Sequence, residues 1–463
     1  MKNSTGDEET CAKTEIRVYS RRWLILLTFC LYSASNAMQW IEYSVIENKV
    51  TAFYGVSSSA ADWLSMVYCL VYATAILPAD WFVQRFGLLP AVITGAVLNA
   101  LGAWTKVLSA QPPLFLVTML GQFLASAGQL FVLGLPPIVA AVWFDKKQVS
   151  TATALGVFGN NLGNGLGFLL PPLFVTSDNV TANSAEVANE FRNLFYFGAT
   201  WTTLILLLIL VVFRSRPPSP PSLAQAAAQT ALVRQSYKQT LFALFHKRSF
   251  VLMFITYGLC TGTFIAYSTL LNSIVLKFKI DSPNIEQIIG DLGLTFTIAG
   301  IVGSFVVGPI MDKTHEYKKA TLVVYFASVF MTAVCIGCLY LGWIWALFLV
   351  NAALGFFMTG YLPIGFEFCV ELTYPVAENL TAGLLNGSAQ IFGIALIYIG
   401  RALLNSIAFH GATWCMTAFA LTLLFGGVLS IFIPENLFRQ TAEHDEKFRS
   451  RAVTMEATDI KQS

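Results

Sequence analysis

The chain has 463 residues, of which 56% are hydrophobic and only 12% are charged, and its mean hydropathy is +0.65. Soluble domains carry about 25% charged residues, so this composition excludes an ordinary soluble protein and indicates an integral membrane protein. The net charge of +2 and the lack of a basic patch interleaved with aromatic residues give no sign of nucleic-acid binding.

Twelve apolar segments, each long enough to cross a bilayer, follow one another along the chain. A Pro/Ser-rich stretch that begins at residue 214 separates the first six from the last six. We therefore expect an N-terminal six-helix bundle at 21–213, a cytoplasmic linker at 214–246, a C-terminal six-helix bundle at 247–433, and cytoplasmic tails at 1–20 and 434–463. The expected spans are 22–47, 62–84, 88–108, 113–143, 149–174, 191–213, 247–277, 287–312, 319–342, 345–370, 378–405 and 411–433.

The distribution of lysine and arginine predicts the orientation. Basic residues gather before the first span, after the fourth and eighth spans, in the central linker and in the C-terminal tail, which all lie on one side. This pattern places both termini in the cytoplasm, although Lys277 and Lys279 are exceptions on the outer side. The sequon at Asn179 would then face outward and be available for glycosylation, which favours the secretory route and the plasma membrane.

A cluster of polar and aromatic residues interrupts the first apolar segment. Asn36, Gln39, Trp40 and Tyr43 recur at i, i+3, i+4 and i+7, which places them on one face of a helix. Amides in membrane helices often bond to neighbouring helices, so this face could hold the bundle together. The alternative is that it forms part of a ligand site.

An internal repeat supports the ligand site. An offset of 228 residues separates Gln84, beside Arg85, from Asp312, beside Lys313. The same offset takes Gln39 to Tyr267, and an offset of 229 takes Asn161 to Gln390. Polar positions related in this way are expected around a cavity between two parallel halves.

These motifs resemble known families. The stretch Gly308-x-x-x-Asp312-Lys313 with its following lysines resembles the loop motif of the major facilitator superfamily. The strings NAMQWIEYS, FYGVSSSAADWLSMVY, AYSTLLN, GFEFCVELTYP and GLLNGSAQIFG resemble the feline leukaemia virus subgroup C receptor family of solute carriers. This resemblance implies an all-α membrane protein with the twelve-helix major facilitator superfamily fold, in which two six-helix halves are related by pseudo-two-fold symmetry.

The resemblance also implies movement of choline and ethanolamine, or, by an older assignment, of heme. Family positions that match Asn36, Gln39, Trp40, Tyr267 and Gln390 line the central substrate cavity. The family usually has glutamine where this chain has Asn161, and the shorter amide weakens the expectation of a direct ligand contact there. The resemblance suggests that the chain acts as a monomer.

The residue types agree with an ammonium substrate. A quaternary ammonium has no N–H to donate, so Trp40 and Tyr267 are expected to hold it by cation–π contacts of about 0.5–2 kcal/mol each. Gln39, Gln390 and Asn161 are expected to bond the alcohol end of the ligand. No carboxylate falls among the paired positions expected at the cavity, Gln39 with Tyr267 and Asn161 with Gln390, which favours uniport over proton coupling. Glu367 and Glu371 are candidates for a cytoplasmic gate or for simple solvation of a helix end.

Other function classes lack their signatures in the sequence. Heme binding asks for axial ligands and basic partners at mid-membrane, and the four histidines fall outside the expected cavity. We find no nucleophile elbow, no metal-ligand spacing and no repeated filter element, so we expect neither an enzyme, a metal or cofactor site, nor a channel. Seven of the eight cysteines lie in apolar runs, where buried core positions are the expected role.

Overall fold

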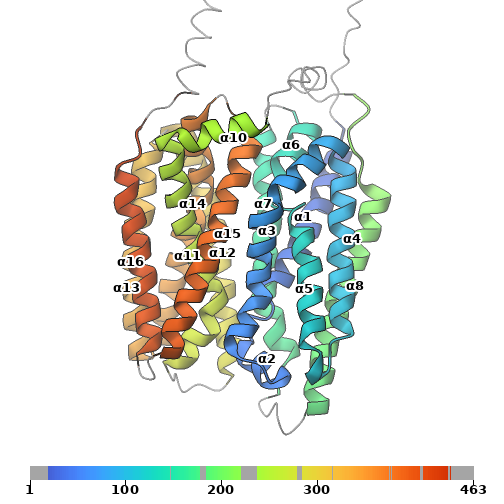
Figure 1. Cartoon of the computed structure of the whole chain (residues 1–463), viewed down its shortest axis with the longest axis vertical. Helices are drawn as coiled ribbons and strands as arrows, with labels where there is room; N and C mark the ends of the chain where they lie inside the picture. Colours follow the sequence, from blue (N-terminus) through green and yellow to red (C-terminus); the bar gives the residue numbers. More distant parts are fainter. Residues whose placement is uncertain are drawn as a thin grey trace, which may run out of the picture.

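Helices arranged as two side-by-side bundles make up the computed structural model, as Figure 1 shows. The structure describes residues 19–145, 148–177, 184–219, 237–278, 284–314, 316–374, 376, 378–406, 410–435 and 438. The N-terminal bundle contains α1 (Arg21–Ile41), α2 (Glu47–Tyr54), α3 (Ser58–Phe86), α4 (Leu88–Val107), η1 (Pro112–Leu114), α5 (Phe115–Gln129), α6 (Pro136–Trp143), α7 (Val149–Phe174) and α8 (Ser184–Val212). The C-terminal bundle contains α11 (Arg248–Lys277), α12 (Ile285–Thr314), α13 (Tyr317–Leu341), α14 (Ile344–Thr373), α15 (Glu378–Ser406) and α16 (Gly411–Ile431).

Each of the twelve expected spans has a counterpart among these helices. Ten helices of the described chain are long and apolar enough to cross a membrane on their own. The eleventh pass is α7, which carries several amides and glycines, and the twelfth is α5 followed by α6. The all-α, twelve-helix fold expected from the sequence is therefore confirmed.

Short α10 (Tyr237–His246) lies across one end of the molecule, where α6 ends and α11 begins, and α2 lies at the other end (Figure 1). We call these ends the α10 face and the α2 face. Helix α10 forms the last part of the linker expected at 214–246, while the Ala-rich part of that linker lies outside the described residues.

The first span differs from the expected continuous helix over 22–47. Helix α1 ends at Ile41, a turn covers residues 42–46, and α2 then runs to Gly55, whose φ of 65° is the left-handed conformation that glycine adopts freely. The turn brings the side chain of Ser44 to within 2.9 Å of Ser65 on α3. The chain therefore changes direction where a straight helix was expected.

The fourth span also differs, because the expected helix over 113–143 is broken into α5 and α6 by turns at 130–135. Pro136 and Pro137 occupy the first turn of α6, where their missing N–H groups leave no hydrogen bond unmade. The break follows from those two prolines, since neither can continue a helix from the preceding turn.

Close helix packing holds each bundle together. Gly163 of α7 lies so near α1 that a Cβ at this position would be 2.1 Å from the carbonyl oxygen of Ala34. Gly355 of α14 lies equally near α12, where a Cβ would be 2.1 Å from the carbonyl oxygen of Phe296. Small residues let membrane helices approach in this way. Between the bundles, α7 packs against α12 and α3 against α15, and we call this interface the seam.

Candidate functional site

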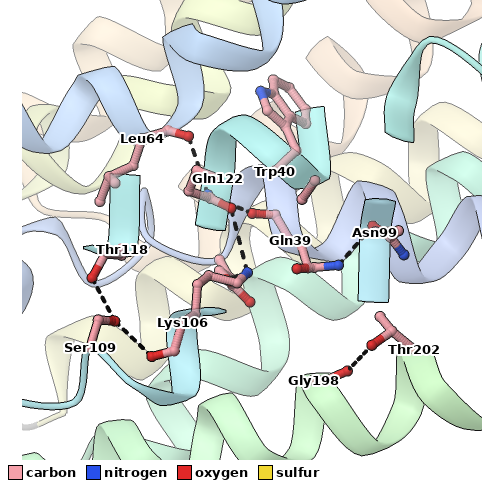
Figure 2. Close-up of polar contacts among 12 residues, drawn as sticks. Gln39, Trp40, Leu64, Asn99, Lys106, Ser109, Thr118, Gln122, Gly198 and Thr202 are labelled. Atoms are coloured by element: carbon pink, nitrogen blue, oxygen red, sulfur yellow. Dashed lines mark hydrogen bonds and ion pairs between the residues drawn. The ribbon is translucent and has the colours of Figure 1, made fainter. Parts of the chain in front are cut away.

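The two amides of α1 face α4. The Nδ2 of Asn36 and the Nε2 of Gln39 both donate to Oδ1 of Asn99, at 2.9 and 2.8 Å, and Asn36 Nδ2 also lies 2.8 Å from the carbonyl oxygen of Ala125. Figure 2 shows Gln39 reaching toward Asn99. In this structure the amides therefore tie α1 to its neighbours, which is the helix-packing alternative left open by the sequence.

Each of these amides keeps one unused atom. Within the described residues, Oδ1 of Asn36 and Oε1 of Gln39 are buried and accept no hydrogen bond. A buried acceptor without a donor costs about 1–3 kcal/mol, so such atoms are sites where a ligand or water would be favourable. The packing role and a ligand role are consequently compatible for the same side chains.

The indole of Trp40 turns away from this amide network, as Figure 2 shows. Trp40 lies in the last turn of α1 and is 7% exposed, and its carbonyl oxygen accepts a hydrogen bond from Ser65 at 3.2 Å. No other aromatic ring of the described residues pairs with its indole. The expected single face over Asn36, Gln39 and Trp40 is therefore split, with the amides facing α4 and the indole facing elsewhere.

Tyr267 is fixed inside the C-terminal bundle. Its hydroxyl donates to Oδ1 of Asn351 on α14 at 2.8 Å, and Nδ2 of Asn351 donates to the carbonyl oxygen of Leu292 at 2.6 Å. The Tyr267 ring lies 5.4 Å from that of Phe296, at an interplanar angle of 54°. Helices α12 and α14 thus set the orientation of the ring and use its hydroxyl.

Asn161 on α7 and Gln390 on α15 are buried, and neither makes a hydrogen bond with the described part of the chain. Both helices border the seam, because α7 packs on α12 and α15 packs on α3. Their amide groups are therefore free to bind a polar ligand, although the structure shows no direct contact between them.

A buried ion pair that the sequence reading did not single out extends the amide network. The Nζ of Lys106 on α4 lies 2.5 Å from Oε1 of Glu42, and the two side chains are only 3% and 4% exposed. Lys106 also lies 3.4 Å from Oε1 of Gln122, whose Nε2 donates to the carbonyl oxygen of Gln39 at 2.9 Å. The network therefore runs from Asn99 through Gln39 and Gln122 to Lys106 (Figure 2).

A second charged cluster joins the two bundles at the α2 face. The guanidinium of Arg401 on α15 binds both carboxylate oxygens of Asp62 on α3, at 2.6 and 2.7 Å. It also lies 3.7 Å from Glu47 on α2 and donates to Ser273 on α11 at 2.8 Å, and Ser273 bonds Glu47. We call Arg401, Asp62, Glu47 and Ser273 the seam cluster.

Neutral side chains reinforce the seam cluster. Asn272 on α11 donates to the carbonyl oxygen of Val45 at 2.7 Å, and Asn48 on α2 donates to Glu286 on α12 at 2.8 Å. The sequence reading missed this interface. The available signal was a charged residue inside an apolar span, since Arg401 falls within the expected span 378–405.

The repeated loop-motif residues and the two candidate gate carboxylates have different surroundings. Arg85 and Lys313 are exposed, and the side chain of Asp312 lies outside the described residues, as does Asn179. Glu367 and Glu371 are one turn apart, but Glu367 is exposed whereas Glu371 is buried, so the two carboxylates meet different surroundings.

Metal and redox sites have no support in the described part of the chain. No group of three or more His, Cys, Asp or Glu side chains there is placed to hold a metal ion. The seven described cysteines are free, and Cys335 and Cys338 are buried in α13.

Comparison with known proteins identifies the class of this membrane protein. Residues 24–369 match the family model of the Major Facilitator Superfamily, so the chain belongs to that superfamily. Solved structures agree on the fold. A bacterial homologue of the human lysosomal transporter Spinster superposes with a TM-score of 0.65 at 12% identity, over 91% of this chain and 99% of that one. The fucose:proton symporter FucP of E. coli gives 0.61 at 12% identity, over 88% and 98%.

Curated relatives identify the family within the superfamily. The choline/ethanolamine transporter flvcr2a of Danio rerio is 45% identical over 95% of this chain and 92% of its own length. The choline/ethanolamine transporter FLVCR2 of Homo sapiens is 42% identical over 96% of this chain and 82% of its own length. The chain is therefore a member of the feline leukaemia virus subgroup C receptor family of transporters, as the sequence motifs predicted, and it is not an enzyme.

Proposed function

We propose that this chain moves choline and ethanolamine across a membrane by facilitative, alternating-access transport. The observation that carries this proposal is the 45% identity, over 95% of the chain, to a transporter named for those two amines. The seam supports it, because two bundles that meet along packed helices, with one polar cluster at the α2 face, can rock against each other around a central site.

The proposed substrate site lies between the halves. The indole face of Trp40, free of other rings, and the ring of Tyr267 hold the ammonium by cation–π attraction, worth about 0.5–2 kcal/mol per ring. Asn161 and Gln390 offer free amides to the alcohol end of the ligand. The unused oxygens of Asn36 and Gln39 add acceptors, which a primary ammonium such as ethanolamine would use more fully than choline.

The seam cluster acts as the gate at the α2 face in this proposal. The gate near the α10 face is formed by Arg85, Asp312, Lys313, Glu367 and Glu371. Uniport is favoured because the carboxylates of Glu42, Asp62 and Glu47 each lie beside a lysine or arginine. A proton relay needs a carboxylate that gains and loses its proton during transport, which a tightly held counter-cation opposes.

Heme transport, the alternative implied by the family resemblance, gains no support from the site. The histidines of the described chain are His246, the last residue of α10, and His410, next to the start of α16. Both lie at helix ends rather than near Trp40 or Tyr267, so neither is placed as an axial ligand for a heme in the proposed cavity.

Uptake of labelled choline and ethanolamine tests the proposal, in cells that express the wild type, Trp40→Ala or Tyr267→Ala at equal surface levels. We expect each variant to lose at least about tenfold in uptake efficiency, because one cation–π contact of about 1.4 kcal/mol is removed. Trp345→Ala is the matched control, since Trp345 is 67% exposed and takes part in neither network. The proposal fails if the wild type carries neither amine.

We also propose that the chain is a monomer in the plasma membrane with the α10 face in the cytoplasm. Asn179 would then carry a glycan on the outer side. Asn179→Gln should abolish a glycosidase-sensitive mobility shift. A second sequon begins at Asn379, on the cytoplasmic side in this orientation, so replacement of Asn379 should leave the shift unchanged. A shift that persists in Asn179→Gln and disappears with Asn379 would reverse the orientation.

A further inference from the structure

A basic pocket opens at the α10 face of the N-terminal bundle, away from the proposed substrate site. It has a volume of about 850 Å³ and lies where four helix ends meet: the start of α1, the start of α4, the end of α6 and the end of α8. Its lining residues are Tyr19, Arg21, Leu89, Trp143, Arg214 and Arg216, with the short segment 215–218. We propose that this pocket binds the phosphate head group of an anionic phospholipid.

The first argument for this proposal is the positive charge of the pocket. Arg21 uses one donor on the carbonyl oxygen of Val212 at 2.9 Å. Arg214 and Arg216 are exposed and have neither a hydrogen bond nor an ion pair with the described residues. The nearby carboxylate of Asp145 already forms an ion pair, at 3.6 Å, with Arg22, which is not a lining residue. Two guanidinium groups therefore remain free for an anion, and guanidinium is the group best shaped for phosphate.

A buried donor in the same pocket is a second, independent observation. Trp143 is 3% exposed, and its indole Nε1–H finds no acceptor within the described chain. A buried N–H without an acceptor is unfavourable, and a phosphate oxygen in the pocket would supply one. The ligand class that satisfies both the orphan N–H and the free guanidinium groups is an anion rich in acceptor oxygens.

The position of the pocket favours a lipid over a soluble phosphate. Helix ends mark the depth at which the chain leaves the hydrocarbon, which is the depth of lipid head groups. Figure 1 shows α8 at the outer edge of the N-terminal bundle beside α4. Below the pocket, α8 exposes a strip of apolar side chains on which acyl chains would lie: Leu204, Leu207, Leu210 and Val211.

Binding of a fluorescent phosphatidylinositol bisphosphate to the purified full-length protein tests the proposal. Each basic residue contributes about 1 kcal/mol to binding of an anionic head group. Arg214→Gln/Arg216→Gln should therefore bind about 30-fold more weakly than the wild type. The matched control is Lys247→Gln/Arg248→Gln, which removes the same charge from exposed positions of the same face outside the pocket and should bind like the wild type.

Trp143→Phe keeps an aromatic ring and removes the orphan donor, so it should weaken binding about fivefold, and it remains informative if the double arginine variant does not fold. Equal losses of affinity in the two double variants would show attraction to general surface charge and would overturn the pocket as the binding site. Equally tight binding of free inositol trisphosphate would overturn the lipid as its ligand. Binding of phosphatidylcholine with the same affinity would overturn recognition of an anionic head group.

Discussion

Lys106 and Glu42 form their ion pair inside the N-terminal bundle, whereas Arg401 and Asp62 form theirs across the seam between the two bundles. The two pairs have similar distances, 2.5 and 2.6 Å, and both are almost fully buried. Only the second pair has to separate if the bundles rock apart. The same chemistry is therefore expected to stabilise one rigid body in the first case and one conformation of the whole molecule in the second.

The largest effect, a loss of folding stability, is expected for Lys106→Met, which leaves Glu42 buried without its cation. Removal of one partner of a buried pair costs about 3–5 kcal/mol, because the remaining charge stays desolvated. We expect a much lower midpoint in thermal denaturation of the purified protein. Glu42→Gln/Lys106→Met should recover most of the loss, since neither new side chain needs a counter-charge. A single variant as stable as the wild type would show that Glu42 accepts a proton in place of the pair.

A smaller effect of a different kind is expected for Asp62→Asn. Arg401 would lose a charged partner that accepts two hydrogen bonds, would keep one bond to the amide oxygen, and would keep Glu47 at 3.7 Å. Separation of the bundles at the α2 face therefore becomes easier by about 2 kcal/mol, or roughly 30-fold in population. Thr269→Cys is a reporter, because Thr269 is buried one turn from Ser273 on the same face of α11. We expect faster labelling of this cysteine by a membrane-impermeant maleimide when Asp62→Asn is added.

The control for this experiment is Glu316→Gln. Glu316 pairs with Lys319 at 2.5 Å, but the two side chains are 51% and 69% exposed, and a surface pair contributes about 0–1 kcal/mol. It should leave the labelling rate unchanged. If Asp62→Asn labels no faster than Glu316→Gln, the seam cluster does not hold the α2 face closed.

The sequence predicted the helices and the family, but it did not predict which helices the polar face of α1 would contact. Apolar runs and family motifs predicted the twelve helices and the family, because both signals are local in the chain. Helical spacing placed Asn36, Gln39 and Trp40 on one face, but a face about 100° wide can meet two neighbours, and the amides meet α4 while the indole does not. Spacing alone does not say which neighbour each edge of a stripe contacts.

No local sequence pattern could predict the contacts of the seam cluster. Arg401 and Asp62 are 339 residues apart, and Lys106 lies 64 residues from Glu42. A charge within an apolar span signals that a partner exists, but the partner's identity depends on how the helices assemble. The turn after Ile41 makes the partners of Glu42 and Glu47 still harder to predict, since it moves both residues away from where a straight helix over 22–47 would put them.

The smallest effect is expected for Tyr267→Phe, which removes a neutral hydrogen bond inside one bundle. The bond to Asn351 at 2.8 Å contributes about 0.5–1.5 kcal/mol, and the ring keeps its contact with Phe296. If the ring face holds the ammonium, Tyr267→Phe should retain choline uptake, with a rise in KM of a few-fold at most, whereas Tyr267→Ala should lose it. Equal loss in both variants would assign the effect to the Asn351 bond and to packing within the C-terminal bundle, and would remove Tyr267 from the aromatic site. Uptake kinetics at matched surface expression separate these outcomes, because a ring contact with substrate and a bond to Asn351 make opposite predictions for the phenylalanine variant.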